Sequence, residues 1–308
     1  MFCDKDPVTN FIKKRNMNNE LNNKNVKTFD FETLYTSIPQ DKLKKEISEL
    51  LKKFFILKKK KFISVAGKHA YLALKRSKTG FSVSFNQLID CINFLIDNSY
   101  VTYRNKLYRQ SLGIPMGTNC APYLANLFLH CYETKFVEIL VNEGKTQEAK
   151  FLNSVYRYQD DCIVIDDEDY FSRNWRYIYP KEMLLKETNV DTLCNYLELT
   201  IWNTNNVFQH KSYDKRLDFN FEVINYLAGN VPNCQSYGVS TSQLIRFCEV
   251  NSEYDVFEED IIRLKNNLIK QGFNIDILKT KFLDFCISNI YRWAKFGRDV
   301  SDMINVFH

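Results

Sequence analysis

The sequence predicts an α/β fold of the α+β kind, from the pattern of its apolar residues. Val155–Ile165, VYRYQDDCIVI, is typical of strand, tight turn and strand, because apolar and aromatic residues flank a polar centre. Residues 26–31 predict another short strand, and residues 196–202 and 207–213 are strand-like. Residues 240–308 carry apolar residues at helical spacing. We therefore expect an antiparallel sheet with packed helices, followed by a helical subdomain.

Composition limits the class of protein. The chain has 308 residues, 45% hydrophobic residues and a net charge of +5, which is compatible with a polyanionic partner. It contains no run of 18 apolar residues and no signal-peptide core at its start, so we expect an intracellular protein of the nucleus or cytoplasm, neither secreted nor in a membrane. The nine cysteines include no Cys-x-x-Cys pair and predict free thiols, and the four histidines lack zinc-ligand spacing.

Asp160 and Asp161 occupy the predicted turn of the 155–165 hairpin. Two adjacent carboxylates repel each other, so this arrangement is costly unless a cation, usually a divalent metal, lies beside them. A second pair, Asp166–Asp167, lies in a polar acidic run and is typical of a solvated loop. Pattern alone leaves a metal site and a merely exposed turn as alternatives for the first pair.

The stretch after residue 31 predicts helix starts and turns. Ser37 with Gln40, and Ser84 with Gln87, each match a capping box, and Pro39 suits a first helical turn. A hairpin is expected around Arg104–Asn105. The lysine run at 58–61 is typical of a solvated helix face, with nucleic-acid contact as the alternative.

A glycine-containing loop, Gly113–Pro122, precedes an amphipathic helix. Glycine lets backbone approach a ligand closely, although a plain turn before a helix is the alternative interpretation.

Three blocks follow one another along the chain: Asp30 on a strand with Tyr35 five residues later, the Gly113–Gly117 loop (GIPMG) before a helix, and Tyr158–Asp161 (YQDD) on a hairpin. This ordered set resembles the palm of reverse transcriptases, with the closest resemblance to enzymes of Penelope-like retroelements, which are themselves similar to telomerase reverse transcriptase. Further similarity runs from about residue 26 to the end. The matching segments are Phe29–Pro39 (FDFETLYTSIP), Leu107–Gly117 (LYRQSLGIPMG) continuing to Phe128, Tyr158–Asp161 (YQDD), Tyr196–Ile201, Tyr213–Phe221 and Tyr237–Arg246.

The resemblance implies a right-hand polymerase fold. Residues 26–225 would be a reverse transcriptase palm with an insertion at 40–110, and residues 226–308 a helical thumb-like subdomain. Residues 1–25 would be a loose lead-in and a remnant of the fingers. Most of the fingers region that precedes the first block in the family has no counterpart here, because only 29 residues come before Asp30.

The resemblance also implies a metal centre. Asp30, Asp160 and Asp161 would be the catalytic carboxylates, and the Phe31 carbonyl would add a backbone ligand. Two Mg²⁺ ions, with Mn²⁺ as the alternative, would serve an in-line displacement at phosphorus, because hard cations prefer oxygen ligands.

Substrate contacts follow from the same resemblance. Tyr35 would lie beneath the incoming sugar and clash with a 2′-hydroxyl, with core packing as the alternative role for its ring. Gly113, Met116 and Gly117 would lie against the template base and primer.

These expectations define a leading function and its rivals. The leading hypothesis is an RNA-directed DNA polymerase domain of a Penelope-like retroelement that uses an RNA template, a DNA primer and dNTPs. The alternative is a catalytically inactive nucleic-acid-binding remnant or domesticated copy. An RNA-templated RNA polymerase is a third, which Tyr35 disfavours. The sequence does not determine the oligomeric state.

Overall fold

Two compact units make up the chain. The computed structural model describes residues 5–18, 25–165, 169–189, 193–215, 227 and 229–307. One unit comprises residues 29–188, and the other joins residues 4–28 to residues 189–308. The predicted acidic loop at Asp166–Asp167 and the greater part of the block Tyr213–Phe221 lie outside the described residues.

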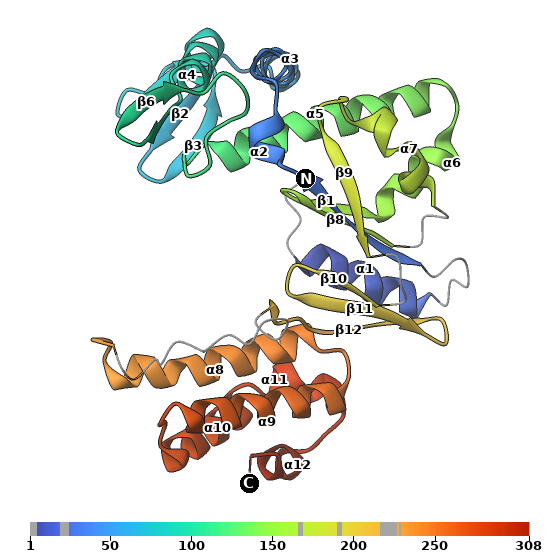
Figure 1. Ribbon diagram of the computed structural model, residues 1–308, viewed down its shortest axis with the longest axis vertical. Helices are drawn as coiled ribbons and strands as arrows, with labels where there is room; N and C mark the ends of the chain where they lie inside the picture. The colour runs from blue at the N-terminus through green and yellow to red at the C-terminus, as the bar shows by residue number, and fades with distance from the viewer. Residues whose placement is uncertain are drawn as a thin grey trace. The chain divides into compact units, whose positions relative to one another are not determined.

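A four-stranded sheet forms the centre of the first unit (Figure 1). Its order is β7-β8-β1-β9, so the first strand of the chain lies between strands that come more than a hundred residues later. The strands are β1 (Val26–Glu32), β7 (Val155–Tyr158), β8 (Asp161–Ile165) and β9 (Leu184–Asn189). The pairing of β7 with β8 is antiparallel and confirms the predicted hairpin.

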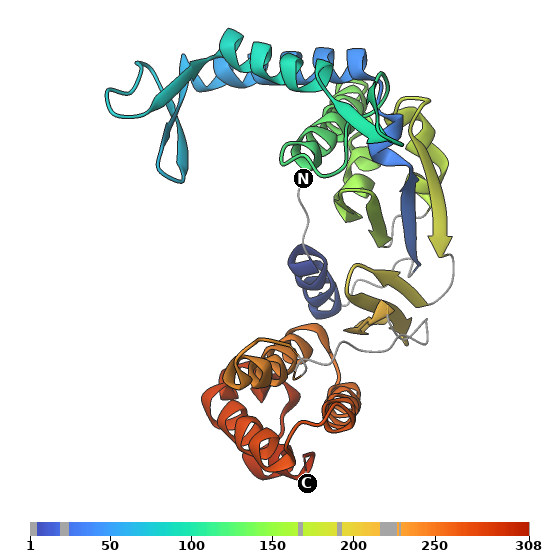
Figure 2. The same ribbon diagram turned by 60° about the vertical axis from the view of Figure 1, so that its left-hand side comes forward.

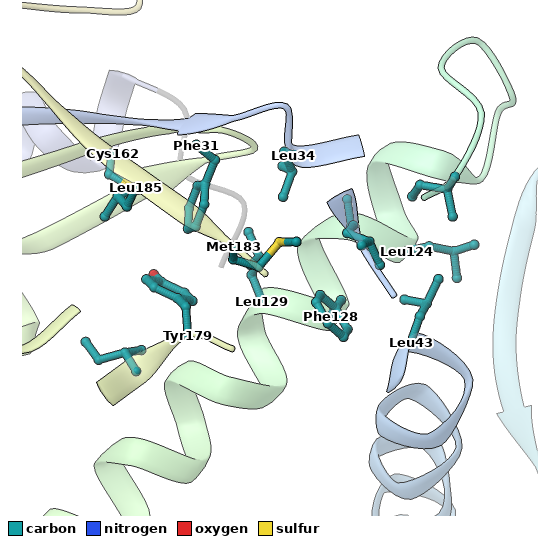
Figure 3. Packing of buried hydrophobic residues seen from close by; sticks show 14 of the residues in the cluster. Phe31, Leu34, Leu43, Leu124, Phe128, Leu129, Cys162, Tyr179, Met183 and Leu185 are labelled. Atoms are coloured by element: carbon teal, nitrogen blue, oxygen red, sulfur yellow. The ribbon is translucent and has the colours of Figure 1, made fainter. Parts of the chain in front are cut away.

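Helices cover one face of this sheet. A single hydrophobic cluster joins Phe29 and Phe31 of β1, Cys162 and Val164 of β8, and residues of the helices (Figure 3). Alternate strand residues point to opposite faces, so these four residues identify the covered face. The helices of this unit are α2 (Leu34–Ser37), α3 (Gln40–Lys58), α4 (Phe85–Asp97), α5 (Ala121–Asn142), α6 (Thr146–Phe151), the 3₁₀ turn η1 (Leu152–Ser154) and α7 (Tyr170–Ile178).

The 40–110 region contains α3, α4 and two small sheets. One has the order β3-β2-β4, and the other is the hairpin β5–β6. The left-handed residues Arg104 and Asn105 connect β5 to β6, as predicted. Ser84 and Gln87 form the predicted capping box at the start of α4. The strands are β2 (Phe62–Ala66), β3 (His69–Ala73), β4 (Phe81–Ser84), β5 (Tyr100–Tyr103) and β6 (Lys106–Arg109).

The capping box predicted for Ser37 and Gln40 is wrong. Pro39 is the N-cap of α3 and no side chain caps it. The Ser37 hydroxyl pairs instead with Thr33, and the Gln40 amide donates to the carbonyl oxygens of Gln110 and Gly113. The Gln40 side chain, which the local pattern assigns to a helix cap, therefore bonds instead to carbonyl groups about 70 residues later in the chain.

The second unit contains a three-stranded antiparallel sheet, β10 (Leu193–Tyr196), β11 (Leu199–Thr204) and β12 (Val207–Ser212). The strand expected at 196–202 is interrupted by a turn at 197–198, where Leu197 is left-handed.

The expectation of a loose lead-in at residues 1–25 is wrong for residues 5–17. This stretch forms α1 (Lys5–Met17), whose Val8 and Ile12 lie one turn apart and are buried. The Asn16 side chain also exchanges two hydrogen bonds with the Phe208 backbone of β12. The polar composition hid a narrow apolar stripe that this packing stabilises.

The C-terminal region confirms the predicted helices over residues 240–307. Its elements are α8 (Asn233–Val250), α9 (Tyr254–Lys270), α10 (Ile275–Ser288), α11 (Ile290–Trp293), η3 (Ala294–Phe296) and α12 (Val300–Asn305). They share a second hydrophobic cluster that includes Phe257, Phe282 and Trp293. In the part of the chain that the structure describes, no helix is both long and apolar enough to cross a membrane.

Candidate functional site

Asp30 lies in the middle strand β1, between two core residues. Phe29 and Phe31 are 2% exposed and belong to the helix-covered cluster. Asp30 is partly exposed, and strand alternation places it on the opposite face. Burial of the two phenylalanines thus fixes the face that presents the Asp30 carboxylate.

The Asp160–Asp161 pair lies at the tip of the β7–β8 hairpin. The sequence predicted Asp160 and Asp161 in the turn, but Tyr158 pairs with Asp161, so Gln159 and Asp160 make the two-residue turn and Asp161 is the first residue of β8. Gln159 has φ 54°, which is a left-handed conformation. Such tight turns suit the twist of antiparallel strands.

Adjacent strands bring the two acidic positions together. The Phe31 amide donates to the Asp160 carbonyl over 3.2 Å, so the turn is bonded to the residue next to Asp30. Asp161 precedes Cys162, a residue of the covered cluster, and therefore lies on the same face of the sheet as Asp30. The backbone thus places Asp30, Asp160 and Asp161 on the hairpin turn and the two inner strands, next to Phe31.

The donor set suits a hard cation, although the carboxylates are not gathered around one point. Within the described residues, no group of three or more His, Cys, Asp or Glu side chains is arranged to hold a metal ion. Mg²⁺ is commonly bound through one or two carboxylates, with waters and substrate phosphates completing its shell. Asp30 and Asp160, on neighbouring strands, fit that requirement. Metal binding here stays a prediction.

Tyr35 lies beside the hairpin turn. Its hydroxyl donates to the Gln159 side chain over 3.2 Å. Burial raises the pKa of Tyr35, and the charge of Asp160 raises it further. Tyr35 packs against the main cluster with part of its ring and keeps its polar end at the turn. Tyr35 therefore both packs against the core and lies near Asp160.

The Gly113 loop is bonded to the segment that carries Tyr35. The Ile114 amide donates to the Tyr35 carbonyl over 2.7 Å, and the Gly113 amide donates to the Ile38 carbonyl over 2.9 Å. The Gln40 side chain donates to the Gly113 carbonyl over 2.9 Å. The 35–40 segment is therefore bonded both to the Gly113 loop and, through Tyr35, to the hairpin turn at Gln159. Further along the loop, the Met116 side chain is 71% exposed, and Gly117 has φ 98° with open space around it.

Gly113→Ala tests this junction. Gly113 has φ 77°, and an added Cβ would lie 2.4 Å from the Tyr35 carbonyl oxygen and 2.6 Å from the Thr36 Cα. These are backbone atoms that cannot rotate away, so we expect a loss of about 2–5 kcal/mol from strain and overlap together. Urea unfolding, monitored by circular dichroism, measures the loss.

Gly144→Ala is the matched control. Gly144 has nearly the same φ, 75°, but nothing lies within 4 Å of its added Cβ. Only backbone strain remains, and we expect a loss of about 1 kcal/mol. Equal losses for the two variants would contradict the close approach at Gly113.

Sequence reasoning missed a network behind the hairpin turn. Arg157 is 5% exposed and donates to the Gln159 carbonyl over 3.1 Å. It also donates to both carboxylate oxygens of Glu133 and to the Asn126 side chain. Asn126 and Glu133 lie seven residues apart, on one face of α5. An arginine between aromatic strand residues, with an amide and an acid at that spacing, is the signal that was available.

The network is charged despite its burial. Burial by itself raises the pKa of Glu133, but the Arg157 guanidinium outweighs it, and the Tyr179 hydroxyl adds a hydrogen bond, so the pKa is lowered. Burial acts in the opposite direction on Arg157 and lowers its pKa, but the charge of Glu133 outweighs burial, so the pKa of Arg157 is raised. Both partners therefore stay ionised, and the turn is anchored to α5 by an ion pair.

Comparison with known proteins supplies the fold's relatives. No protein-family model matches the chain, and no curated protein matches it. The structure of telomerase from Candida albicans in complex with a TWJ fragment of telomeric RNA matches with a TM-score of 0.65 and 12% identity, over 99% of this chain and 50% of that one. Telomerase from Candida tropicalis with a TWJ fragment matches with a TM-score of 0.50 and 13% identity, over 99% and 49%.

The fold is that of a right-hand polymerase. The chain has the mixed α/β architecture that the sequence predicted, with antiparallel strand pairing, packed helices and a helical C-terminal region. It spans about half the length of the solved structures that it matches. At 12–13% identity this similarity describes the fold alone, and the boundaries of palm, insertion and thumb stay predictions.

Proposed function

We propose that the chain is the RNA-directed DNA polymerase domain of a Penelope-like retroelement. The observation that carries the proposal is the meeting of three segments within one unit: the Asp30 strand, the Asp160 turn bonded to it, and the Gly113 loop bonded to Tyr35. In a right-hand polymerase fold this junction combines carboxylates, a glycine loop and an aromatic side chain. These are the groups that nucleotidyl transfer requires.

Each residue has a role in this proposal. Asp30 and Asp160, with the Phe31 carbonyl, would hold divalent Mg²⁺ or Mn²⁺, and Asp161 would support them. When bound, the metal would supply charge neutralisation and activation of the primer hydroxyl. Tyr35 would exclude a 2′-hydroxyl from the sugar site. Its fixed position against the turn, through Gln159, suits a steric role.

The Gly113 loop and the second unit would bind the nucleic acid. The loop would support the template base and primer through Gly113, Met116 and Gly117. The C-terminal helices would grip the RNA–DNA duplex through its phosphates, a contact with little sequence preference. The matched telomerase structures contain telomeric RNA, which supports an RNA partner for this fold.

Primer extension tests the function. With an RNA template, a DNA primer, dNTPs and Mg²⁺, we expect the primer to lengthen by template-directed addition of deoxynucleotides. EDTA should stop extension, because it chelates the divalent metal that the carboxylates would otherwise bind. Salt-dependent binding of primer–template with no extension in Mg²⁺ or Mn²⁺ would instead support the inactive nucleic-acid-binding remnant.

A further inference from the structure

Positive charge is concentrated in one region of the chain. Residues 40–110 contain 16 Lys and Arg against 5 Asp and Glu, a net charge of +11 in a chain whose total is +5. The rest of the chain is therefore net negative. A basic region of this kind attracts polyanions, provided that its cations gather on one surface.

Four of these lysines line one groove. Lys52, Lys59, Lys60 and Lys61 border a cavity of about 810 Å³ between the end of α3 and the start of α4. The described residues that line it include no Asp or Glu. The N-terminus of α4, a helix of 13 residues, opens beside them and adds partial positive charge. We name these four lysines and their cavity the lysine groove.

The lysine groove is built on fixed backbone. Lys59 is left-handed and ends α3, and its amide donates to the Ile56 carbonyl. The Lys60 amide donates to the Phe55 carbonyl, and the Lys61 amide to the Ala73 carbonyl. The run is thus a helix cap joined to a strand, and its backbone is ordered by hydrogen bonds.

Aromatic packing forms the floor of the groove. Phe55 is 6% exposed and contacts the Phe85 ring edge-on, with centroids 5.9 Å apart. A ring that is already packed in this way leaves little face for a base to stack on. The groove therefore offers cations to phosphates and little for base recognition.

The groove lies away from the candidate site. The first residue of α3, Gln40, bonds to the Gly113 loop, and the helix then runs for 19 residues, or about 28 Å at 1.5 Å per residue. Figure 2 shows α3 leading away from α2 toward the sheet β3-β2-β4. A strand that contacts both places must extend about 8 nucleotides, at about 3.4 Å per nucleotide.

We infer that the lysine groove binds the sugar–phosphate backbone of a nucleic-acid strand, as a second contact outside the candidate polymerase site. The charge of the groove, the absence of carboxylates among its described lining residues and its hydrogen-bonded backbone favour a regular polyanion over a folded protein surface of mixed charge. This contact needs no catalysis, so it can exist whether or not the proposed polymerase activity does.

Salt-dependent binding tests the groove. The variant Lys59→Gln, Lys60→Gln, Lys61→Gln keeps polar side chains and removes three charges. For an RNA template annealed to a DNA primer, we expect the slope of log Kobs against log salt to become shallower by about 2–3, because each phosphate contact contributes about 0.7–0.9. The matched control, Lys145→Gln, Lys150→Gln, Lys181→Gln, removes three exposed lysines of the same unit and should change the slope by less than about 0.5. Equal slopes for the two triple variants would overturn the inference.

Footprinting adds position to the same test. Wild-type protein should protect nucleotides about 8 or more positions from the primer terminus, and the groove variant should lose only that distant protection. The distance rests on the proposed function, because it takes the Gly113 loop as the place of the primer end. A shallower slope with protection unchanged both near the terminus and about 8 nucleotides away would support the groove and show that its expected distance from the primer end is wrong. Loss of protection near the terminus, with the distant part kept, would overturn the groove.

Discussion

Asp160→Asn is expected to abolish primer extension, with a loss of at least about 1,000-fold. Asparagine has the shape of aspartate without its charge, so a metal held by this carboxylate should be lost or misplaced. A thousandfold loss corresponds to about 4 kcal/mol of transition-state stabilisation. Single-turnover extension of a labelled primer on an RNA template measures the effect.

The matched control is Asp90→Asn. Asp90 is exposed on α4 in the same unit, so this variant removes an equal charge away from the candidate site. We expect its extension rate to stay within about twofold of wild type, as for a surface substitution. Extension by Asp160→Asn within tenfold of wild type would leave the polymerase class standing but would show that Asp160 is not a metal ligand.

Binding separates the catalytic role from the nucleic-acid contact. Affinity for primer–template arises mainly from basic groups on phosphates, and Asp160→Asn removes a negative charge from the site. We therefore expect its affinity to be unchanged or slightly higher. The pKa of Tyr35 gives an independent check of the geometry, because burial and then Asp160 raise it. Removing that charge should lower the Tyr35 pKa, which NMR of labelled tyrosine can follow.

Sequence patterns predicted the parts of this fold that depend on near neighbours. The 155–165 hairpin, the capping box of Ser84 with Gln87 and the C-terminal helices all follow from residues a few positions apart, although the hairpin turn lies one residue earlier than predicted. The ordered blocks also led to the right-hand polymerase fold. Penelope-like membership and the metal ligands stay predictions.

Tertiary partners explain what the patterns could not predict. Gln40 resembles a cap residue, but the carbonyl of Gly113, 73 residues later, takes its amide. The strand pattern around Arg157 gives no sign of its partners, because α5 supplies the carboxylate of Glu133 and the side-chain amide of Asn126. In each case the deciding neighbour is distant in sequence, and no local periodicity encodes it.

Arg157→Met is expected to destabilise the first unit by about 3–5 kcal/mol and to slow extension as well. The substitution leaves the Glu133 carboxylate without its cation, and breaking one partner of a buried ion pair carries a cost of this size. It also removes the hydrogen bond to the Gln159 carbonyl, so the Asp160 turn loses its anchor. Urea unfolding and primer extension measure the two effects. Lys53→Met, which breaks the exposed pair with Glu138, should cost less than about 1 kcal/mol.

A double substitution distinguishes anchoring of the turn from stability alone. Glu133→Leu with Arg157→Met removes both charges, and apolar replacement of a buried pair is often nearly neutral. We expect this variant to regain a large part of the lost stability, while its extension stays slow because the Gln159 carbonyl is still unsupported. Affinity for primer–template should remain near wild type, since the basic surface is unchanged. If extension recovers together with stability, Arg157 serves folding only; if it stays slow in a stable protein, Arg157 positions the Asp160 turn.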